Sequence, residues 1–293
     1  MHICIGRLNC RPEKKRKTNM PSLAVSLLLA LLRLVLAAPS AQCDLHHATS
    51  CPGLTPKKLV FVLAGQSNMA GRGGVSRDLW DGAVPPQCRP SPSILRLSAR
   101  LRWEVAREPL HADVDVNKTC GVGPGMAFAH AILSSVFWAA RPPPVIGLVP
   151  CAVGGTRIEE WAKGTALYDG LVRRARAAAG KLGAVLWYQG ESDTVSREDA
   201  EAYRARMERL ILHLRSDLEM PGLLLIQVAI ASGEGNFTEI VRKAQKDICL
   251  PSVACVDAKG LQLEADHLHL TTSAQVQLGE MLAATYLTHA MSK

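Results

Sequence analysis

The stretch Phe61-Val-Leu-Ala-Gly-Gln-Ser-Asn-Met-Ala70 decides how the rest of this chain is interpreted. The apolar run at residues 59–64 predicts a buried strand that ends at Gly65, and Ser67 follows where the chain turns. A serine on such a turn holds its Oγ clear of the sheet, and open α/β sheets bind ligands beyond the carboxyl ends of their strands. Ser67 is therefore a candidate nucleophile, and the alternative is a serine that caps the following helix.

Strands and helices alternate from this stretch to the C-terminus. Four more strands are expected, at residues 145–149, 183–188, 223–229 and 253–256. Helices are expected at residues 125–138, 165–180, 197–218, 238–248 and 271–287. This alternation indicates an α/β fold, with a five-stranded, mostly parallel sheet between two layers of helices. Residues 71–120 contain no long periodic segment and are predicted to form a long connection along one side of the site.

The positive charge of the chain is concentrated in its first 41 residues. The 293 residues include 34 Lys and Arg against 26 Asp and Glu, and residues 1–41 hold seven of the basic and one of the acidic residues. The remainder is nearly balanced, which removes the main argument for nucleic-acid binding.

The same 41 residues have the parts of a secretory signal peptide. A basic cluster precedes the apolar run at residues 20–38, and small residues follow. We therefore divide the chain into a leader at 1–41, with Met20 as a candidate start, and one domain at 42–293. The alternatives are a membrane anchor, which Arg33 inside the run opposes, and a nuclear address at residues 14–17. Once the leader is removed, we expect no stable membrane association.

Cysteines and glycosylation sequons also fit secretion. Six cysteines could form three disulfides in an oxidising compartment, and the pairing we expect is Cys43–Cys51, Cys88–Cys120 and Cys249–Cys255. Cys151 remains as a buried thiol. The sequons begin at Asn117 and Asn236.

Unusual polar and glycine-rich segments follow four of the five predicted strands, all at one edge of the sheet. These segments are Gly65-Gln-Ser67, a block with Gly154-Gly155, Gln189-Gly-Glu-Ser-Asp193 and Asp266-His-Leu-His269. A serine hydroxyl needs a base within hydrogen-bond reach, and a carboxylate must orient that base. His269 and Asp266 are the candidates for these two roles.

The tetrahedral intermediate of acyl transfer also needs hydrogen-bond donors, each worth about 3–4 kcal/mol. The candidate donors are the backbone N–H of Ser67, a backbone N–H at Gly154-Gly155 and the side-chain amide of Gln189. Glu191 is expected to fix its loop.

Each piece has a simpler interpretation. Gly154-Gly155 could be only a turn, Gln189 could satisfy backbone groups, and Asp266 could cap the last helix. An Asp-x-x-His cluster could belong to a metal site, but no second ligand group stands out, so we predict no metal and no cofactor. Glu191 and Asp193 resemble a glycosidase carboxylate pair, yet residues two apart after a strand tend to point in opposite directions.

The four segments together resemble the SGNH-hydrolase superfamily. The resemblance rests on Gly65-Gln-Ser-Asn-Met69, Gly154-Gly-Thr156 with Trp161, the segment 187–193 and Asp266-x-x-His269, and it runs from about Lys58 to the C-terminus. More narrowly, these motifs resemble the sialate O-acetylesterase-like branch and the plant carbohydrate esterases of family six. The resemblance implies a flavodoxin-like three-layer sandwich. It also implies a serine esterase with Ser67 as nucleophile, His269 as base, Asp266 as its partner and Gly154-Gly155 as oxyanion donor. Gln189 stands where many members of the superfamily have an asparagine.

The sequence thus predicts a secreted carbohydrate O-acetylesterase acting on an acetylated carbohydrate such as a cell-wall polysaccharide. A carbohydrate-binding protein on the same fold would need a damaged triad, whereas all three members are present. A transacetylase would use the same residues with a sugar hydroxyl in place of water as acceptor. The oligomeric state stays open.

Overall fold

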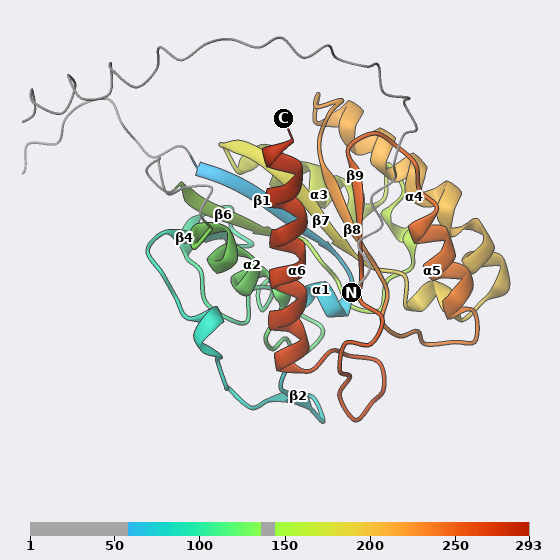
Figure 1. Cartoon of the computed structure of the whole chain (residues 1–293), viewed down its shortest axis with the longest axis horizontal. Coiled ribbons are helices and arrows are strands. Elements are labelled where there is room, and N and C mark those ends of the chain that lie inside the picture. The colour runs from blue at the N-terminus through green and yellow to red at the C-terminus, as the bar shows by residue number, and fades with distance from the viewer. Residues whose placement is uncertain (1–57, 136–143, 293) are drawn as a thin grey trace, which may run out of the picture. The chain divides into compact units, whose positions relative to one another are not determined.

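Seven strands form one sheet in the order β5-β4-β6-β1-β7-β8-β9, and β5 alone runs antiparallel to its neighbour (Figure 1). The computed structural model describes residues 58–135 and 144–292. The strands of the sheet are β1 (Lys58–Gly65), β4 (Ile94–Leu97), β5 (Trp103–Val105), β6 (Val145–Pro150), β7 (Lys181–Tyr188), β8 (Leu225–Ala229) and β9 (Val253–Asp257). A separate hairpin consists of β2 (Val75–Ser76) and β3 (Leu79–Trp80).

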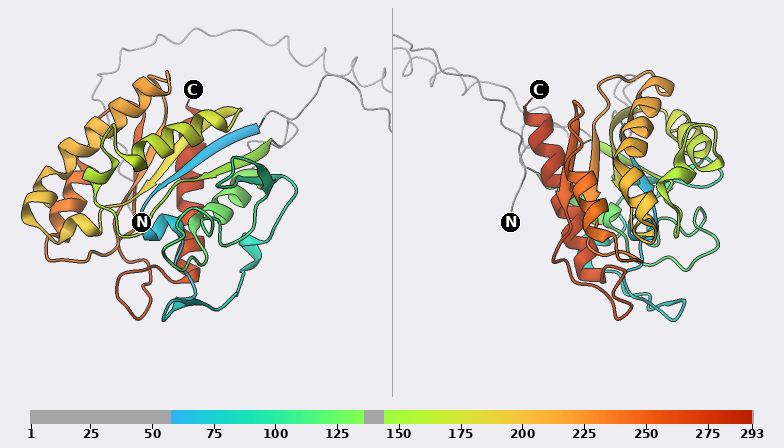
Figure 2. Two further views of the ribbon diagram at one scale, coloured as in Figure 1. Left: turned by 180° about the vertical axis from the view of Figure 1, so that it is seen from behind. Right: turned by 90° about the vertical axis from the view of Figure 1, so that its right-hand side faces the viewer.

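Helices cover both faces of the sheet, as the alternation of elements predicts. The helices are α1 (Ser67–Ala70), α2 (Pro124–Leu133), α3 (Ala166–Ala177), α4 (Arg197–Asp217), α5 (Thr238–Lys246) and α6 (Thr272–Met291). Short 3-10 turns lie at η2 (Pro86–Cys88), η4 (Ile158–Trp161) and η5 (Ser192–Thr194). Helices α2 and α6 lie on one face, and α3, α4 and α5 lie on the other (Figures 1 and 2). This arrangement follows from right-handed crossovers, because the chain moves first to one side of β1 and then to the other.

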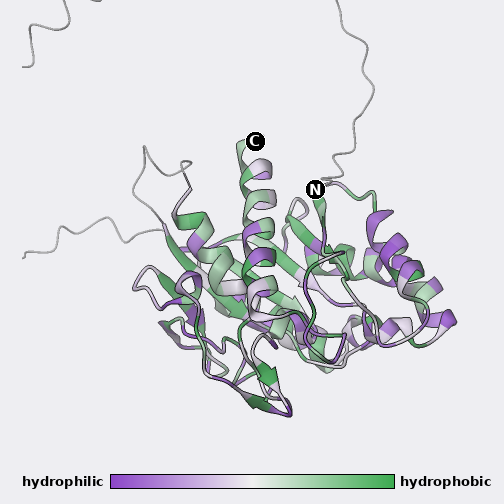
Figure 3. Cartoon of the chain, turned by 60° about the horizontal axis from the view of Figure 1, so that its bottom comes forward, coloured by the Kyte–Doolittle hydropathy of each residue, from purple (hydrophilic) through white to green (hydrophobic). Residues whose placement is uncertain are grey.

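The central strand β1 is buried on both faces, so its sequence is a continuous apolar run. On one face Phe61 packs edge-to-face against Phe128 of α2 and Tyr286 of α6, with ring centroids 4.7 and 4.8 Å apart. On the other face Trp187 of β7 meets Trp161 at 5.2 Å. The strands are accordingly mostly hydrophobic in Figure 3, whereas the outer turns of the peripheral helices carry hydrophilic residues.

The predicted five-stranded sheet is wrong in its strand number. The five expected strands correspond to β1, β6, β7, β8 and β9, but β4 and β5 add two more within the 71–120 connection. Both are only a few residues long, and the pair Arg96 and Glu104 faces across them with a 2.7 Å ion pair. Charged residues at the edge of a sheet interrupt the apolar pattern by which a strand is recognised.

The predicted leader, the candidate start at Met20 and the Cys43–Cys51 pair lie outside the described residues. The helix expected at 125–138 is observed as α2, Pro124–Leu133, and residues 136–143 are likewise outside. Within the described ranges, no helix combines the length and apolar character needed to cross a bilayer.

Candidate active site

The turn that carries Ser67 is fixed by contact between two neighbouring strands. β1 ends at Gly65, whose φ is +125°, and an added Cβ there would lie 2.1 Å from the carbonyl oxygen of Tyr188 on β7. The next N–H, that of Gln66, donates to the same carbonyl at 2.8 Å. Only glycine fits this close approach, so the backbone is forced to turn here and α1 begins at Ser67.

The structure brings the three predicted triad residues together. His269 Nε2 lies 2.9 Å from Ser67 Oγ, and His269 Nδ1 lies 2.6 Å from Asp266 Oδ2, although Ser67 and His269 are 202 positions apart in sequence. An ionised carboxylate only accepts hydrogen bonds, so Asp266 requires the proton of His269 on Nδ1. Nε2 is then left as the acceptor for the serine hydroxyl, which is the tautomer that a general base needs.

Asp266 is held in its ionised form by its own loop. Partial burial raises its pKa, but hydrogen bonds from the N–H groups of His269 and Leu268, both 2.9 Å, and from the imidazole outweigh this and lower the pKa overall. The carboxylate therefore both orients His269 and can stabilise the imidazolium that forms when the base takes up a proton.

Asn68, directly after the serine, ties this loop to the serine turn. Its Oδ1 accepts from the N–H of Leu270 at 2.9 Å, and its Nδ2 donates to the carbonyl of Leu268 at 3.3 Å. Nδ2 also donates to Glu191 Oε1 at 2.7 Å, and the side chain is fully buried. The sequence analysis assigned no role to Asn68, although its position next to Ser67 in the motif could have indicated one.

Glu191, which was expected to fix its loop, lies under this junction and contacts Asn68. It is fully buried, and burial raises its pKa to about 7. Its Oε1 accepts from Asn68, whereas its Oε2 has no hydrogen-bond partner in the part of the chain that the structure describes. Asp193 points elsewhere and accepts a hydrogen bond from the N–H of Ile158 at 3.0 Å. The two carboxylates therefore do not flank one glycosidic bond of a substrate, as the pair in a glycosidase does.

Backbone N–H groups beside Ser67 are available for an oxyanion. Gly154 lies so close that an added Cβ would be 3.5 Å from Ser67 Cβ, and Gly155 has a φ of +74° with open space beside it. Among the described residues, no protein group accepts from the N–H of Ser67, Gly154 or Gly155. Unpaired donors beside a serine hydroxyl are what a tetrahedral intermediate requires.

Comparison with known proteins identifies the family to which the chain belongs. A protein family described as carbohydrate esterase, sialic acid-specific acetylesterase, matches residues 57–288. The chain belongs to this family. A probable carbohydrate esterase of Arabidopsis thaliana is 56% identical over 243 residues, which are 80% of this chain and 92% of that protein. The resemblance seen in the motifs is confirmed, and the protein is a carbohydrate acetylesterase.

Solved structures share the fold of this carbohydrate acetylesterase. An X-ray structure of an Arabidopsis thaliana protein is 55% identical, with a TM-score of 0.75 and coverage of 80% of this chain and 99% of that one. The structure of NanS is 17% identical (TM-score 0.65, 82% and 100% covered). A carbohydrate acetylesterase from Xanthomonas citri is 19% identical (TM-score 0.57, 79% and 57% covered). The last two support the fold alone.

The expected oxyanion role of Gln189 does not fit its contacts in the esterase. Its Nε2 donates to the carbonyl of Thr156 at 2.8 Å and to Asp193 Oδ2 at 2.6 Å, and it lies 3.2 Å from Gln66 Oε1. The side chain is fully buried. An amide has two N–H protons, and both are used inside the protein, so Gln189 holds neighbouring loops together.

A buried ion pair lies behind Gly154 in the esterase. Arg72 Nη2 and Asp115 Oδ2 are 2.5 Å apart, and both side chains are more than nine-tenths buried. An added Cβ at Gly154 would lie 2.5 Å from Arg72 Nη2. Both charges come from the 71–120 connection, so this segment does border the site, and the pair was not predicted because nothing in the sequence joins Arg72 to Asp115.

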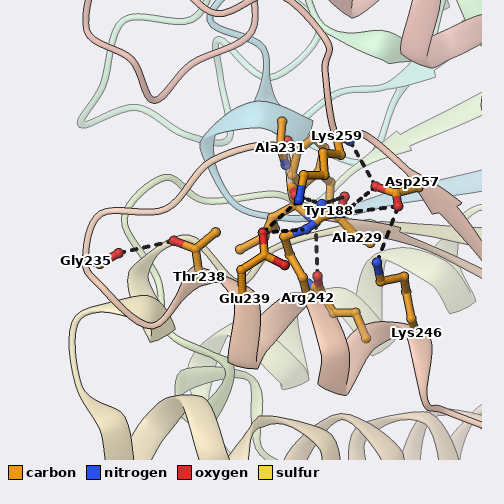
Figure 4. A network of polar contacts seen from close by, with 12 residues as sticks. Tyr188, Ala229, Ala231, Gly235, Thr238, Glu239, Arg242, Lys246, Asp257 and Lys259 are labelled. Atoms are coloured by element: carbon orange, nitrogen blue, oxygen red, sulfur yellow. Dashed lines mark hydrogen bonds and ion pairs between the residues drawn. The ribbon is translucent and has the colours of Figure 1, made fainter.

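A second buried arginine anchors the strand that leads to the Asp266 loop (Figure 4). Arg242 of α5 is 1% exposed, and its Nη2 binds Asp257 at 2.7 and 3.0 Å. The same guanidinium donates to the carbonyl of Ile230 after β8. Asp257 is the last residue of β9, so this contact fixes the point from which the chain departs towards Asp266.

The expected disulfides Cys88–Cys120 and Cys249–Cys255 are wrong. Cys88, Cys120 and Cys249 are thiols, so neither pair is bridged, and Cys151 is also a thiol whose predicted burial is confirmed. Cys88 is buried beside α2, where burial raises its pKa to about 12, and Cys120 accepts a hydrogen bond from Arg72 at 3.5 Å. Cysteine spacing in loops does not determine which side chains meet.

Proposed function

We propose that this carbohydrate acetylesterase is a secreted serine hydrolase that removes O-acetyl groups from a cell-wall polysaccharide through Ser67, His269 and Asp266. The observation that carries the proposal is the continuous chain of hydrogen bonds Asp266–His269–Ser67, with lengths of 2.6 and 2.9 Å. This chain has the polarity of acyl transfer, because a buried serine meets the acceptor nitrogen of an imidazole oriented by a carboxylate.

In the first half of the reaction, Ser67 Oγ attacks the acetyl carbonyl while its proton passes to His269 Nε2. The carbonyl oxygen becomes an oxyanion, and the N–H groups of Ser67 and of Gly154 or Gly155 stabilise it. The intermediate collapses when His269 returns the proton to the leaving sugar oxygen, which leaves an acetyl ester on Ser67. Water then repeats the sequence, with His269 as base, and releases acetate.

Secretion is supported by sequence features together with the exposure of both sequons. Asn117 and Asn236 lie on the surface, where an oligosaccharide could be attached. The test is to express the full chain in plant cells and assay the medium for a protein whose mass falls after deglycosylation. Retention of an unglycosylated protein inside the cells would refute this part of the proposal.

The catalytic part is tested by Ser67→Ala, with Ser216→Ala on the exposed side of α4 as the control. Acetate release from acetylated xylan should fall by about 10⁴- to 10⁶-fold in Ser67→Ala, because the covalent step is removed. The thermal unfolding temperature should stay within a few degrees of the wild type in both variants. If a folded Ser67→Ala protein released acetate at the wild-type rate, the assignment of the nucleophile would be wrong.

A further inference from the structure

A groove of about 900 Å³ lies on the flank of the loop that carries Asp266 and His269. One wall is formed by the β2–β3 hairpin and the residues after it, and the other by the loop residues Gln262 and Glu264 with the first turns of α6. Figure 1 shows β2 beside the start of α6 at this end of the molecule. The volume is at the upper end of the range for sites that hold a whole ligand, and none of the triad residues lines it.

Backbone contacts join both walls of this groove to the site. The N–H of Gly74 on the hairpin side donates to Glu264 Oε1 at 3.3 Å, and the N–H of Glu264 donates to the carbonyl of His269 at 2.7 Å. Leu263 and Leu270 pair as a β-bridge that closes the loop between them. The groove wall and the base therefore belong to one hydrogen-bonded unit, and a ligand in the groove would rest against the back of the loop that holds His269.

The groove presents side chains that are free to bind hydroxyl groups. Gln262, Gln277 and Glu280 all line it, all are exposed, and no hydrogen bond to their side chains occurs in the described ranges. Hydroxyls of Thr272 and Ser273 lie between them at the start of α6. Amides and carboxylates suit sugar hydroxyls, which both donate and accept.

The charge of the lining selects among sugars. Asp81, Glu264 and Glu280 contribute three carboxylates, and no Lys, Arg or His is among the described residues that line the groove. These carboxylates would repel an anionic sugar, although Glu264 and Asp81 each accept a backbone N–H, from Gly74 and Ala83 respectively. A neutral sugar would exchange its hydrogen bonds to water for hydrogen bonds to the carboxylates and amides of the lining.

We infer that this groove is a binding site for the unacetylated part of a neutral glycan chain, and that it selects against sugars with carboxylate groups. The inference rests on the proposed function, because it places other sugar units of the same glycan in the groove on the flank of the His269 loop. It also sets this esterase apart from an enzyme built for sialic acid, an anionic sugar.

The experiment compares substrates that do and do not reach the groove. Gln277→Trp would obstruct part of it and Glu280→Lys would reverse one of its charges, while Glu219→Lys, just beyond the end of α4, is the matched control. With acetylated xylo-oligosaccharides, kcat/KM should fall about tenfold in Gln277→Trp; with 4-nitrophenyl acetate it should stay within about twofold. Glu280→Lys should improve the hydrolysis of acetylated oligogalacturonides, which are anionic, and this gain should shrink as salt is added. Equal loss on both ester types, or no loss on either, would overturn the inference.

A binding measurement separates this inference from the esterase mechanism. Unacetylated xylohexaose, titrated into Ser67→Ala protein, should bind, and binding should weaken about tenfold when Gln277→Trp is added. Failure of wild-type protein to release acetate from any ester would refute the proposed mechanism and leave this result standing. Absence of xylohexaose binding, or tighter binding of oligogalacturonide, would refute the groove while leaving the triad intact.

Discussion

Ser67 and its base His269 lie in two regions that differ in burial: the serine turn is buried, and the loop with His269 is partly exposed. Ser67 is 5% exposed, at the start of α1 directly after the buried strand β1. By contrast, 49% of the Asp266 side chain and 22% of the His269 side chain are exposed. The serine is held by packing within the sheet, where Gly65 lies directly against the carbonyl oxygen of Tyr188. The base is held by polar contacts that run from its loop back to the serine turn.

This difference separates stability from activity along the chain. A change in the exposed loop should alter catalysis with little effect on unfolding, because few apolar contacts are lost. A change in the residues that pack the serine turn against the sheet should affect both, since these residues belong to the core. Asn68 contacts both regions, so a change at Asn68 should lower both stability and activity.

Next to the loss expected for Ser67→Ala, the largest effect should come from the exposed side. In Asp266→Asn the amide would present an N–H to His269 Nδ1, which forces the proton to Nε2, the nitrogen that must accept from Ser67. We expect kcat to fall by about 10²- to 10⁴-fold with unchanged thermal stability. Steady-state kinetics and a thermal melt check this, and a loss of stability together with activity would mean that Asp266 is structural.

Asn68→Ala should break the junction itself. It leaves the N–H of Leu270 and the carboxyl group of Glu191 without their partner in a buried site. The free energy of unfolding should fall by about 2–4 kcal/mol, and the remaining folded protein should have a lower kcat because His269 is no longer held. Urea unfolding and kinetics on 4-nitrophenyl acetate test both effects, with Ser216→Ala as control. Loss of stability with full kcat would show that the loop is positioned without Asn68.

Glu191 adds a pH dependence to the buried side. The folded protein keeps a proton on Glu191 up to about pH 7, whereas the unfolded chain releases it near 4.5. The folded state thus binds more protons in this window, so stability falls as pH rises through it, by about 3 kcal/mol in total. Glu191→Gln is always neutral and should lose this part of the pH dependence between pH 5 and pH 8.

Urea unfolding of wild type, Glu191→Gln and Glu219→Gln at the two pH values provides the comparison. Glu219 is exposed, so its variant should follow the wild type. An unchanged pH dependence in Glu191→Gln would mean that Glu191 is already ionised in the folded protein at pH 5.

The smallest effect is expected at the second contact to the loop. Ser232 Oγ donates to the carbonyl of Leu268 at 2.6 Å. In Ser232→Ala we expect a loss of about 1 kcal/mol in stability and a decrease in kcat of a few fold, since Asn68 still holds the loop. Combining Ser232→Ala with Asn68→Ala in a double-mutant cycle would show whether the two contacts are coupled.

The order of strands and helices was predictable because long apolar runs alternate with helical periodicity. The strand expected at 59–64 is β1, and the edge at which Ser67, Gly154 and His269 meet follows from the parallel arrangement. Strands β4 and β5 were missed because they are short and carry charged residues at an edge of the sheet.

Single side-chain directions were less predictable. Gln189 follows a strand as the other site residues do, yet its amide turns towards Thr156 and Asp193. Which way one side chain turns depends on partners distant in sequence, and the same holds for Asn68 with Leu270 and for Arg72 with Asp115. The positions of functional residues could thus be derived from pattern, whereas their hydrogen-bond partners could not.

The bond between Asn68 and Leu270 spans 202 positions in sequence, and this has a consequence for the order of events in folding. During synthesis the base is added 202 residues after the serine, beyond strand β9 of the sheet. Contacts this distant in sequence form late, because the loop between them must first be closed. The serine therefore stays inert until His269 has been made, and the first hydrolysed ester reports that the loop with His269 has docked.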